Sequence, residues 1–269
     1  MFNTAAPLKQ RLAQARSPLL GGFVFSTDPN ICEVYAEAGF DFVVIDTEHG
    51  LNDVRTVHAH LRSCAATSIS AVIRLGVANF PDVPRLLDGG AEAFMFPHLG
   101  LPGYGADAAI SAMKYPPLGS RPTCTGVQSA GYGIIDFKNT TERANRDALA
   151  IGLVEDRECV ETIDSVFDAT GVDWIMPGPG DLASSYNVHG QLQAPVVENA
   201  VETVFTAARK RNVTTGMYIN DPSEVVRWKG QDVRFFIYSL DYKVMGKALQ
   251  GAIGNCRRHL QTHQTAEAK

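Results

Sequence analysis

The feature that most constrains the fold of this chain is a regular alternation of short apolar stretches with helix-like stretches. Most apolar stretches have strand length and are rich in Val, Ile and Phe, and each is followed by helical spacing or a helix-start signal. Eight predicted strands cover residues 20–25, 42–45, 68–75, 93–99, 148–154, 173–176, 214–219 and 234–240. Eight strand–helix units predict a (β/α)8 TIM barrel of the α/β class, in which parallel strands close into a cylinder.

The organisation of the chain favours one domain. A doubly wound parallel sheet is the alternative fold, but the phosphate-binding pattern G-x-G-x-x-G is absent after the first predicted strand. No linker divides the chain, so we expect one barrel domain over residues 1–269 with an ordered core at about 8–258. Residues 115–147 combine repeated Gly, Pro, Ser and Thr, and we expect an irregular, functional loop there.

Composition excludes several classes of function. The chain has 269 residues, 45% hydrophobic and 20% charged, as in an ordinary soluble globular protein. A net charge of −5 favours neither nucleic acid nor an anionic membrane as a partner. The longest apolar runs are shorter than the ~20 residues that span a bilayer, and the N-terminus lacks a signal-peptide core. Five scattered cysteines without a C-x-x-C pair indicate reduced thiols, so we expect a cytoplasmic protein.

Ionisable residues gather where the predicted strands end. In a barrel all these strand ends face one mouth, so residues that are distant in sequence converge there. The strand-end residues are Asp46 to His49, Arg74, His98, Glu155, Asp181 and Asp241. Each one alone is also explained by a structural ion pair or a helix cap, but the recurrence predicts an active site at the mouth.

Two of these carboxylates predict a metal site. Glu155 and Asp181 follow sequential strands, which lie roughly 5 Å apart in a sheet. Two carboxylates, completed by waters and a chelating substrate, are the usual environment of Mg²⁺ or Mn²⁺. The alternative is that each carboxylate makes a structural ion pair or caps the helix that follows it.

Arg74 and His49 are the candidate catalytic residues of the neighbouring strands. Arg74 interrupts an apolar strand, and a buried arginine needs a charged partner or a ligand. The planar guanidinium group suits a carboxylate. His49 has the chemistry of a general base, and we expect Asp46 to hold its tautomer and raise its basicity. A loop histidine without a catalytic role is the alternative. The turn at 177–181, P-G-P-G-D, offers backbone N–H groups to an anion.

Several motifs together resemble those of the HpcH/HpaI aldolase family. They are F-D-F-V-V-I-D-T-E-H-G, V-I-R, R-L-L-D-G-G-A, K-Y-P-P-L-G-S-R, V-E-D-R-E, G-V-D-W-I-M-P-G-P-G-D-L-A and S-L-D, in order across residues 18–250. The resemblance implies a carbon–carbon lyase, a class II aldolase that cleaves or forms a 4-hydroxy-2-oxo acid. Its products are pyruvate, or a similar 2-oxo acid, and an aldehyde, formed through a metal-stabilised enolate.

The resemblance also implies a cofactor and an assembly. The cofactor is a divalent metal, with Mg²⁺ expected and Mn²⁺ or Co²⁺ as alternatives. The family barrel exchanges its last helix between subunits, so we expect a homo-oligomer, either a hexamer or a dimer-based assembly.

Residue by residue, the resemblance assigns roles at the mouth. Glu155 and Asp181 match the metal ligands, and Asp181 also lies at the substrate site. His49 matches the base, and Arg74 matches the arginine that binds substrate and stabilises the enolate.

Three further positions receive supporting roles from the resemblance. The aspartates that match Asp46 and Asp88 support the basicity of the histidine. Gly180 falls where the family uses a backbone N–H to hold the substrate carboxylate, in a position that alanine or serine often occupies.

The sequence also departs from the family pattern. Leu153 replaces a substrate-contacting glutamine, and residues 119–126 read G-S-R-P-T-C-T-G where G-I-R-G-V is usual. His98 is the first candidate to supply the lost contact to the substrate. The alternatives to an aldolase are therefore a citrate-synthase-like condensing enzyme of a siderophore pathway using oxaloacetate and acetyl-CoA, a decarboxylase, and a non-catalytic ligand-binding barrel.

Overall fold

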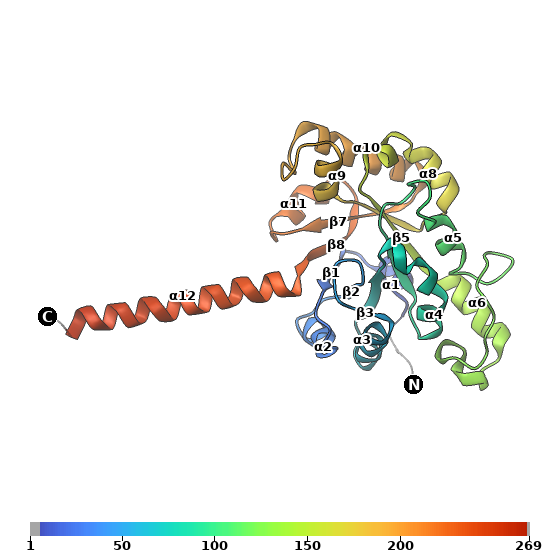
Figure 1. The fold of residues 1–269 in the computed structure, drawn as a ribbon, viewed down its shortest axis with the longest axis horizontal. Helices are drawn as coiled ribbons and strands as arrows, with labels where there is room; N and C mark the ends of the chain where they lie inside the picture. Colours follow the sequence, from blue (N-terminus) through green and yellow to red (C-terminus); the bar gives the residue numbers. More distant parts are fainter. Residues whose placement is uncertain (1–5, 268–269) are drawn as a thin grey trace.

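The computed structural model describes residues 6–267 and forms a closed barrel of eight parallel strands in sequence order, β1 to β8 (Figure 1). The strands are β1 Leu19–Val24, β2 Phe42–Asp46, β3 Ser70–Arg74, β4 Ala93–Phe96, β5 Leu149–Val154, β6 Trp174–Pro177, β7 Thr214–Ile219 and β8 Val233–Leu240. This topology confirms the predicted (β/α)8 barrel and excludes the doubly wound sheet. All eight strands lie within three residues of their predicted positions at either end.

Helices surround the barrel and connect consecutive strands. They are α1 Leu8–Gln14, α2 Asn30–Glu37, α3 Val54–Ala66, α4 Val83–Asp88, α5 Ala106–Ser111, α6 Phe137–Asp147, α7 Arg157–Glu161, α8 Ile163–Thr170, α9 Pro179–Ser185, α10 Pro195–Arg211, α11 Glu224–Lys229 and α12 Asp241–Glu267, with 3₁₀ helices η1 Val77–Asp82 and η2 Gln128–Gly133. No helix within residues 6–267 is both long and apolar enough to cross a membrane.

The strands read as unbroken apolar runs because both of their faces are buried. In β2, Phe42 and Val44 belong to the cluster inside the barrel, whereas Val43 and Ile45 belong to the cluster between barrel and helices. Phe42 fills the interior so closely that a Cβ at Gly21 of β1 would lie 2.2 Å from its ring. The barrel is therefore a packed core, and its chemistry is restricted to the strand ends.

The prediction that residues 115–147 are irregular is wrong for the last part of this segment. Phe137–Asp147 forms α6, and η2 precedes it. Only Thr140 and Asp147 of α6 are buried, so its sequence carries no apolar stripe that helical spacing can reveal. Asp136 begins the helix by accepting the backbone N–H of Lys138 at 2.8 Å. After β5 the chain forms two short helices, α7 and α8, which are separated at Thr162 with φ −116° and ψ 22°.

The last helix does not pack on its own barrel. Figure 1 shows α12 projecting away from β8 into solvent. A barrel normally uses this helix to cover the outside of its first and last strands. Leu20 of β1 is consequently 43% exposed, and α12 itself presents apolar side chains such as Met245, Leu249 and Ile253 to solvent.

Candidate active site

A cavity of about 450 Å³ lies where the strand ends converge, and we call it the mouth cavity. Its lining includes His49, Arg74, Leu153, Glu155, Gly180 and Asp181. Residues from β2, β3, β5 and β6 and the loops that follow them thus meet in one place, as the barrel topology requires. Its volume lies within the range of small-molecule sites, roughly 300–1,000 Å³.

Asp46 and Arg74 form a buried ion pair at the edge of this cavity. They are register partners at the last positions of β2 and β3, and the Arg74 Nε donates to Asp46 Oδ2 at 2.6 Å. The other oxygen of Asp46 accepts the backbone N–H groups of Glu48 (2.9 Å), His49 (2.7 Å) and Gly50 (3.1 Å). Asp46 therefore fixes the arginine and the main chain of the His49 loop. Among the described residues, Asp46 makes no hydrogen bond with the ring of His49, so the expected contact is not formed.

Glu48 occupies the position beside the His49 ring. Its Oε2 lies 3.8 Å from His49 Nε2 and 3.4 Å from Arg74 Nη1. Burial raises the pKa of Glu48 above its ordinary value, while Arg74 and His49 partly offset that effect. Glu48 was among the predicted strand-end residues, but the sequence assigned it no role. The signal was the spacing of Glu48, which follows the strand end by two residues, immediately before the histidine.

Glu155 and Asp181 both line the mouth cavity, as expected. Glu155 follows β5 and is only 5% exposed, whereas Asp181 lies exposed in the first turn of α9. Burial and the charge of Asp181 raise the pKa of Glu155 to about 7. Gly178 makes room for this arrangement, because a Cβ there would lie 2.7 Å from Glu155 Cγ. At Gly180, by contrast, a Cβ would meet nothing within 4 Å.

His98 lies behind Glu155 and is not among the described residues that line the mouth cavity. Its backbone N–H donates to Glu155 Oε2 at 3.2 Å, and its ring Nδ1 lies 2.9 Å from Asp156 Oδ2. Burial lowers the pKa of His98, but the hydrogen bond with Asp156 and the charges of Glu155, Asp156 and Glu48 outweigh burial and raise it. With φ at 51°, His98 adopts a left-handed backbone that suits this contact.

Two other predicted residues lie outside the mouth cavity. Asp88, the last residue of α4, accepts a hydrogen bond from Arg121 Nη2 at 2.9 Å. Asp241 accepts the backbone N–H groups of Phe25 (3.0 Å) and Ser26 (2.8 Å) and so ties β1 to the start of α12. Within a single chain, Asp241 has a structural role, and Asp88 does not reach His49 through any described contact.

Comparison with known proteins identifies the family. The model of the HpcH/HpaI aldolase/citrate lyase family matches residues 19–236, which is most of the barrel. The chain belongs to this family. It is a carbon–carbon lyase of the class II aldolase type, as the strand-end residues and motifs predicted.

Individual relatives agree with this assignment. The hydroxypyruvate/pyruvate aldolase of Sagittula stellata is 32% identical over 71% of this chain and 75% of that protein. The crystal structure of an HpcH/HpaI aldolase from Desulfitobacterium hafniense is 25% identical, with a TM-score of 0.85 over 94% of this chain and 97% of that one. The structure of the citrate synthase SbnG is 26% identical, with a TM-score of 0.84 over 94% of this chain and 98% of that one.

The donors of this aldolase fit a divalent cation. The family is dependent on divalent metals. Within residues 6–267 no group of three or more His, Cys, Asp or Glu side chains is spaced to hold a metal ion. Glu155 and Asp181, the pair predicted from the sequence, line the same cavity. The charge of Asp181 adds to burial in raising the pKa of Glu155, and a bound cation would relieve this repulsion. Substrate and water oxygens would complete the shell.

Proposed function

We propose that this aldolase cleaves or forms a 4-hydroxy-2-oxo acid, with pyruvate or a similar 2-oxo acid and an aldehyde as the other reactants. The observation that carries the proposal is the gathering of His49, Arg74, Glu155 and Asp181 around one cavity. A proton-transfer residue, a guanidinium for an oxyanion and a carboxylate pair are the groups that enolate chemistry requires. The names of the relatives, hydroxypyruvate/pyruvate aldolases among them, support the same substrate class.

Glu155 and Asp181 hold the cation in this proposal, with Mg²⁺ as the expected ion. When bound, the cation supplies Lewis acidity toward the 2-oxo acid. Gly180 lies beside Asp181 in the first turn of α9, and its backbone N–H is assigned to the substrate carboxylate. The space beside Gly180 is open, because a Cβ at this residue would meet no atom within 4 Å, so a ligand can approach its backbone N–H.

Arg74 and His49 carry out the two charge movements. Arg74 stabilises the negative charge that develops on the enolate, from an orientation that Asp46 fixes in advance. His49 moves the proton of the C4 hydroxyl group, either directly or through a water molecule. Glu48 is assigned as a positioning residue, because the same carboxylate oxygen lies near both the arginine and the histidine.

We further infer that the protein works as a homo-oligomer in which α12 packs on a second copy. The helix presents Tyr242, Val244, Met245, Leu249, Ile253 and Leu260 to solvent, each at least 39% exposed. A row of exposed apolar side chains on a projecting helix is typical of an interface. The outer face of β1 at Leu20 is the surface that the helix of a second copy would cover. Truncation after Leu240 should then shift the mass measured by light scattering to that of a smaller species.

The experiment that tests the proposed reaction measures pyruvate release from a 4-hydroxy-2-oxo acid with a coupled dehydrogenase. Wild type should turn over with Mg²⁺ and lose activity after EDTA treatment, and Glu155→Gln should fold but remain inactive in Mg²⁺. Full activity in EDTA-treated enzyme contradicts the metal assignment. Consumption of acetyl-CoA with oxaloacetate, without pyruvate release, identifies the condensing enzyme that the likeness to SbnG suggests.

A further inference from the structure

A second cavity lies at the opposite end of the barrel from the mouth cavity, and we call it the basal cavity. Its volume is about 490 Å³, and it is lined by the starts of β3 and β4 and the residue before β5, together with parts of α1, α3, α6 and η2. Ser70 and Ala93 begin two of these strands, so the catalytic residues lie at the far ends of the same strands. The basal cavity is therefore separate from the site proposed for the aldolase reaction.

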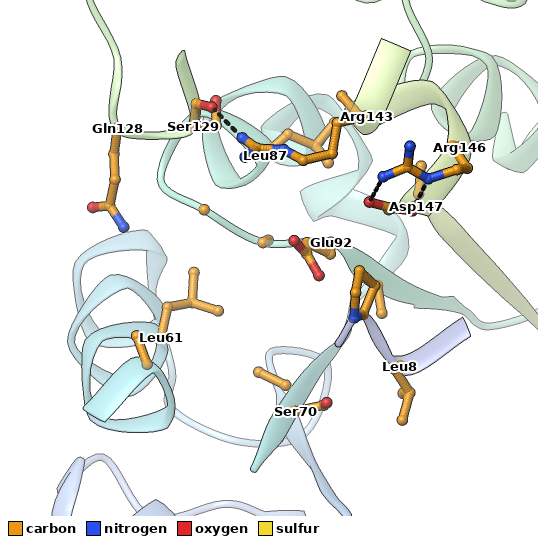
Figure 2. A pocket seen from close by; sticks show the side chains of 18 of the residues that line it. Leu8, Leu61, Ser70, Leu87, Glu92, Gln128, Ser129, Arg143, Arg146 and Asp147 are labelled. Atoms are coloured by element: carbon orange, nitrogen blue, oxygen red, sulfur yellow. Dashed lines mark hydrogen bonds and ion pairs between the residues drawn. The ribbon is translucent and has the colours of Figure 1, made fainter. Parts of the chain in front are cut away.

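Three of the charged groups that line the basal cavity are already neutralised by neighbours. Arg146 makes a bidentate pair with Asp147, with both contacts at 2.8 Å, and Gln10 donates to the same aspartate at 2.8 Å. Arg121 pairs with Asp88 at 2.9 Å. Figure 2 shows the Arg146–Asp147 pair at one side of the cavity. These groups build the wall and leave little charge for a ligand.

Two opposite charges remain unpaired. The carboxylate of Glu92 has no ion pair or side-chain hydrogen bond among the described residues, and Figure 2 shows it pointing into the cavity below Arg143. Arg143 donates one N–H to the backbone carbonyl of Ser129 at 3.2 Å. It likewise makes no ion pair within the described part of the chain. Desolvation and the nearby Asp147 raise the pKa of Glu92, while the charge of Arg143 offsets part of this effect, so the two opposite charges sense each other without forming an ion pair.

The remaining lining is apolar. Leu8, Leu61 and Leu87 are all buried, and Ala65, Ala71 and Ala144 extend the same surface. Arg121 leaves its buried Nε–H without an acceptor among the described residues, so a donor is available in the wall. A ligand that suits this cavity carries one cationic group, one anionic group and an apolar body.

We propose that the basal cavity binds a free α-amino acid with an apolar side chain. The ammonium group pairs with Glu92, the carboxylate pairs with Arg143, and the side chain packs against Leu61 and Leu87. A simple anion fits less well, because Asp147 and Asp88 neutralise the other two arginines and Glu92 would repel it. This inference does not depend on the proposed aldolase reaction.

The test is isothermal titration calorimetry on the full-length protein with L-leucine, L-methionine and L-phenylalanine as probes. N-acetyl-L-leucine lacks the ammonium group and L-leucinamide lacks the carboxylate, so each analogue removes one contact. Saturable binding of at least one amino acid is expected, with a loss of about tenfold or more for each corresponding analogue, the change that one missing charge contact gives.

Two variants assign the contacts. In Glu92→Gln the preference for the amino acid over its N-acetyl form should disappear, and in Arg143→Gln the preference over the amide should disappear. Glu142→Gln is the matched control, because this exposed carboxylate on α6 is not part of the cavity lining. His49→Ala should bind the amino acids as wild type does, which separates this site from the mouth cavity.

Three results overturn the proposal. One is the absence of saturable binding for all three amino acids up to about 10 mM, which would mean that water alone fills the cavity. Another is an amino-acid preference that persists unchanged in both Glu92→Gln and Arg143→Gln. The third is an equal loss of binding in Glu142→Gln. Circular dichroism of each variant shows whether the fold is intact.

Discussion

Arg74 and Asp46 face each other across the ends of β2 and β3, with the arginine Nε 2.6 Å from the aspartate Oδ2. The guanidinium also lies over the ring of Phe23, with 4.6 Å between Cζ and the ring centroid. Its direction is thus set by the protein before any substrate binds, which is how a charge-stabilising group avoids reorganisation during the reaction. Asp46 does this while also accepting three backbone N–H groups from the His49 loop.

Asp46→Asn should therefore damage both stability and turnover. The variant leaves a buried arginine without its principal partner, which costs about 3–5 kcal/mol in the free energy of unfolding. Urea unfolding measures that change, and kcat should fall because Arg74 loses its fixed orientation. Asp241→Asn is a suitable control, since Asp241 is also buried and accepts two backbone N–H groups without an arginine partner. Equal kcat in the two variants would show that Arg74 needs no positioning by Asp46.

Glu48→Gln should slow every reaction that passes through the enolate. Its oxygen is closer to Arg74 (3.4 Å) than to His49 (3.8 Å), so we expect the loss to act mainly through the arginine. Oxaloacetate decarboxylation and aldol cleavage form the same type of enolate, and both should fall by a similar factor, about tenfold.

His49→Ala provides the comparison for that experiment. Removal of a general base costs about 10²–10⁴-fold in aldol cleavage, while decarboxylation does not need proton transfer from a C4 hydroxyl. If Glu48→Gln instead impairs aldol cleavage alone, Glu48 acts through the histidine and the assignment to Arg74 is wrong.

The stability of the protein should depend on pH through Glu92. Its raised pKa means that the folded state binds the proton of this carboxyl group more tightly than the unfolded chain does. The contribution of the protonated group to the free energy of unfolding is therefore complete below the pKa of the unfolded chain, and it is lost as pH rises through the folded pKa. Because glutamine does not ionise, Glu92→Gln does not lose this part of the free energy of unfolding as pH rises. The free energies of unfolding of wild type and variant should converge at acidic pH and diverge toward neutral pH, with the variant more stable. A constant difference across that range would show that the pKa of Glu92 is not raised by folding.

The sequence was sufficient for the barrel because its strands are buried on both faces and separate clearly from their helices. Residues at the ends of those strands followed from topology alone, which is why Arg74 and Glu155 were placed in one cavity. The sequence could not show α6, which has no apolar stripe, since it is held by polar contacts and its cap.

The partners of individual side chains also could not be predicted from the sequence. Asp46 was expected at the ring of His49, but the backbone N–H groups beside it and the arginine on the next strand take both of its oxygens. For His98, the contacts of its backbone N–H to Glu155 and of its ring to Asp156 depend on a left-handed backbone that the sequence does not reveal. Which hydrogen-bond partner a side chain takes depends on the groups that surround it in the folded structure, and residue spacing in the sequence does not determine this.

Leu153 is the position where this chain departs from its family inside the mouth cavity. It lies on β5, only 1% exposed, two residues before Glu155. Leucine offers apolar surface where the family pattern has an amide, and the Nδ1 of His98 is already engaged by Asp156. We therefore expect a native substrate that presents an apolar group, rather than a hydroxyl, toward Leu153.

Leu153→Gln should reverse this preference. A buried polar substrate group that gains a partner is stabilised by about 1–3 kcal/mol, or roughly ten- to a hundredfold in kcat/KM. Substrates with a hydroxyl at C3 of the 2-oxo acid should gain relative to those derived from pyruvate, and the ratio of the two kcat/KM values is the measurement. Leu153→Met is the control, because it keeps the position apolar at similar volume. If the ratio is the same in wild type, Leu153→Gln and Leu153→Met, the leucine serves core packing alone and has no part in substrate choice.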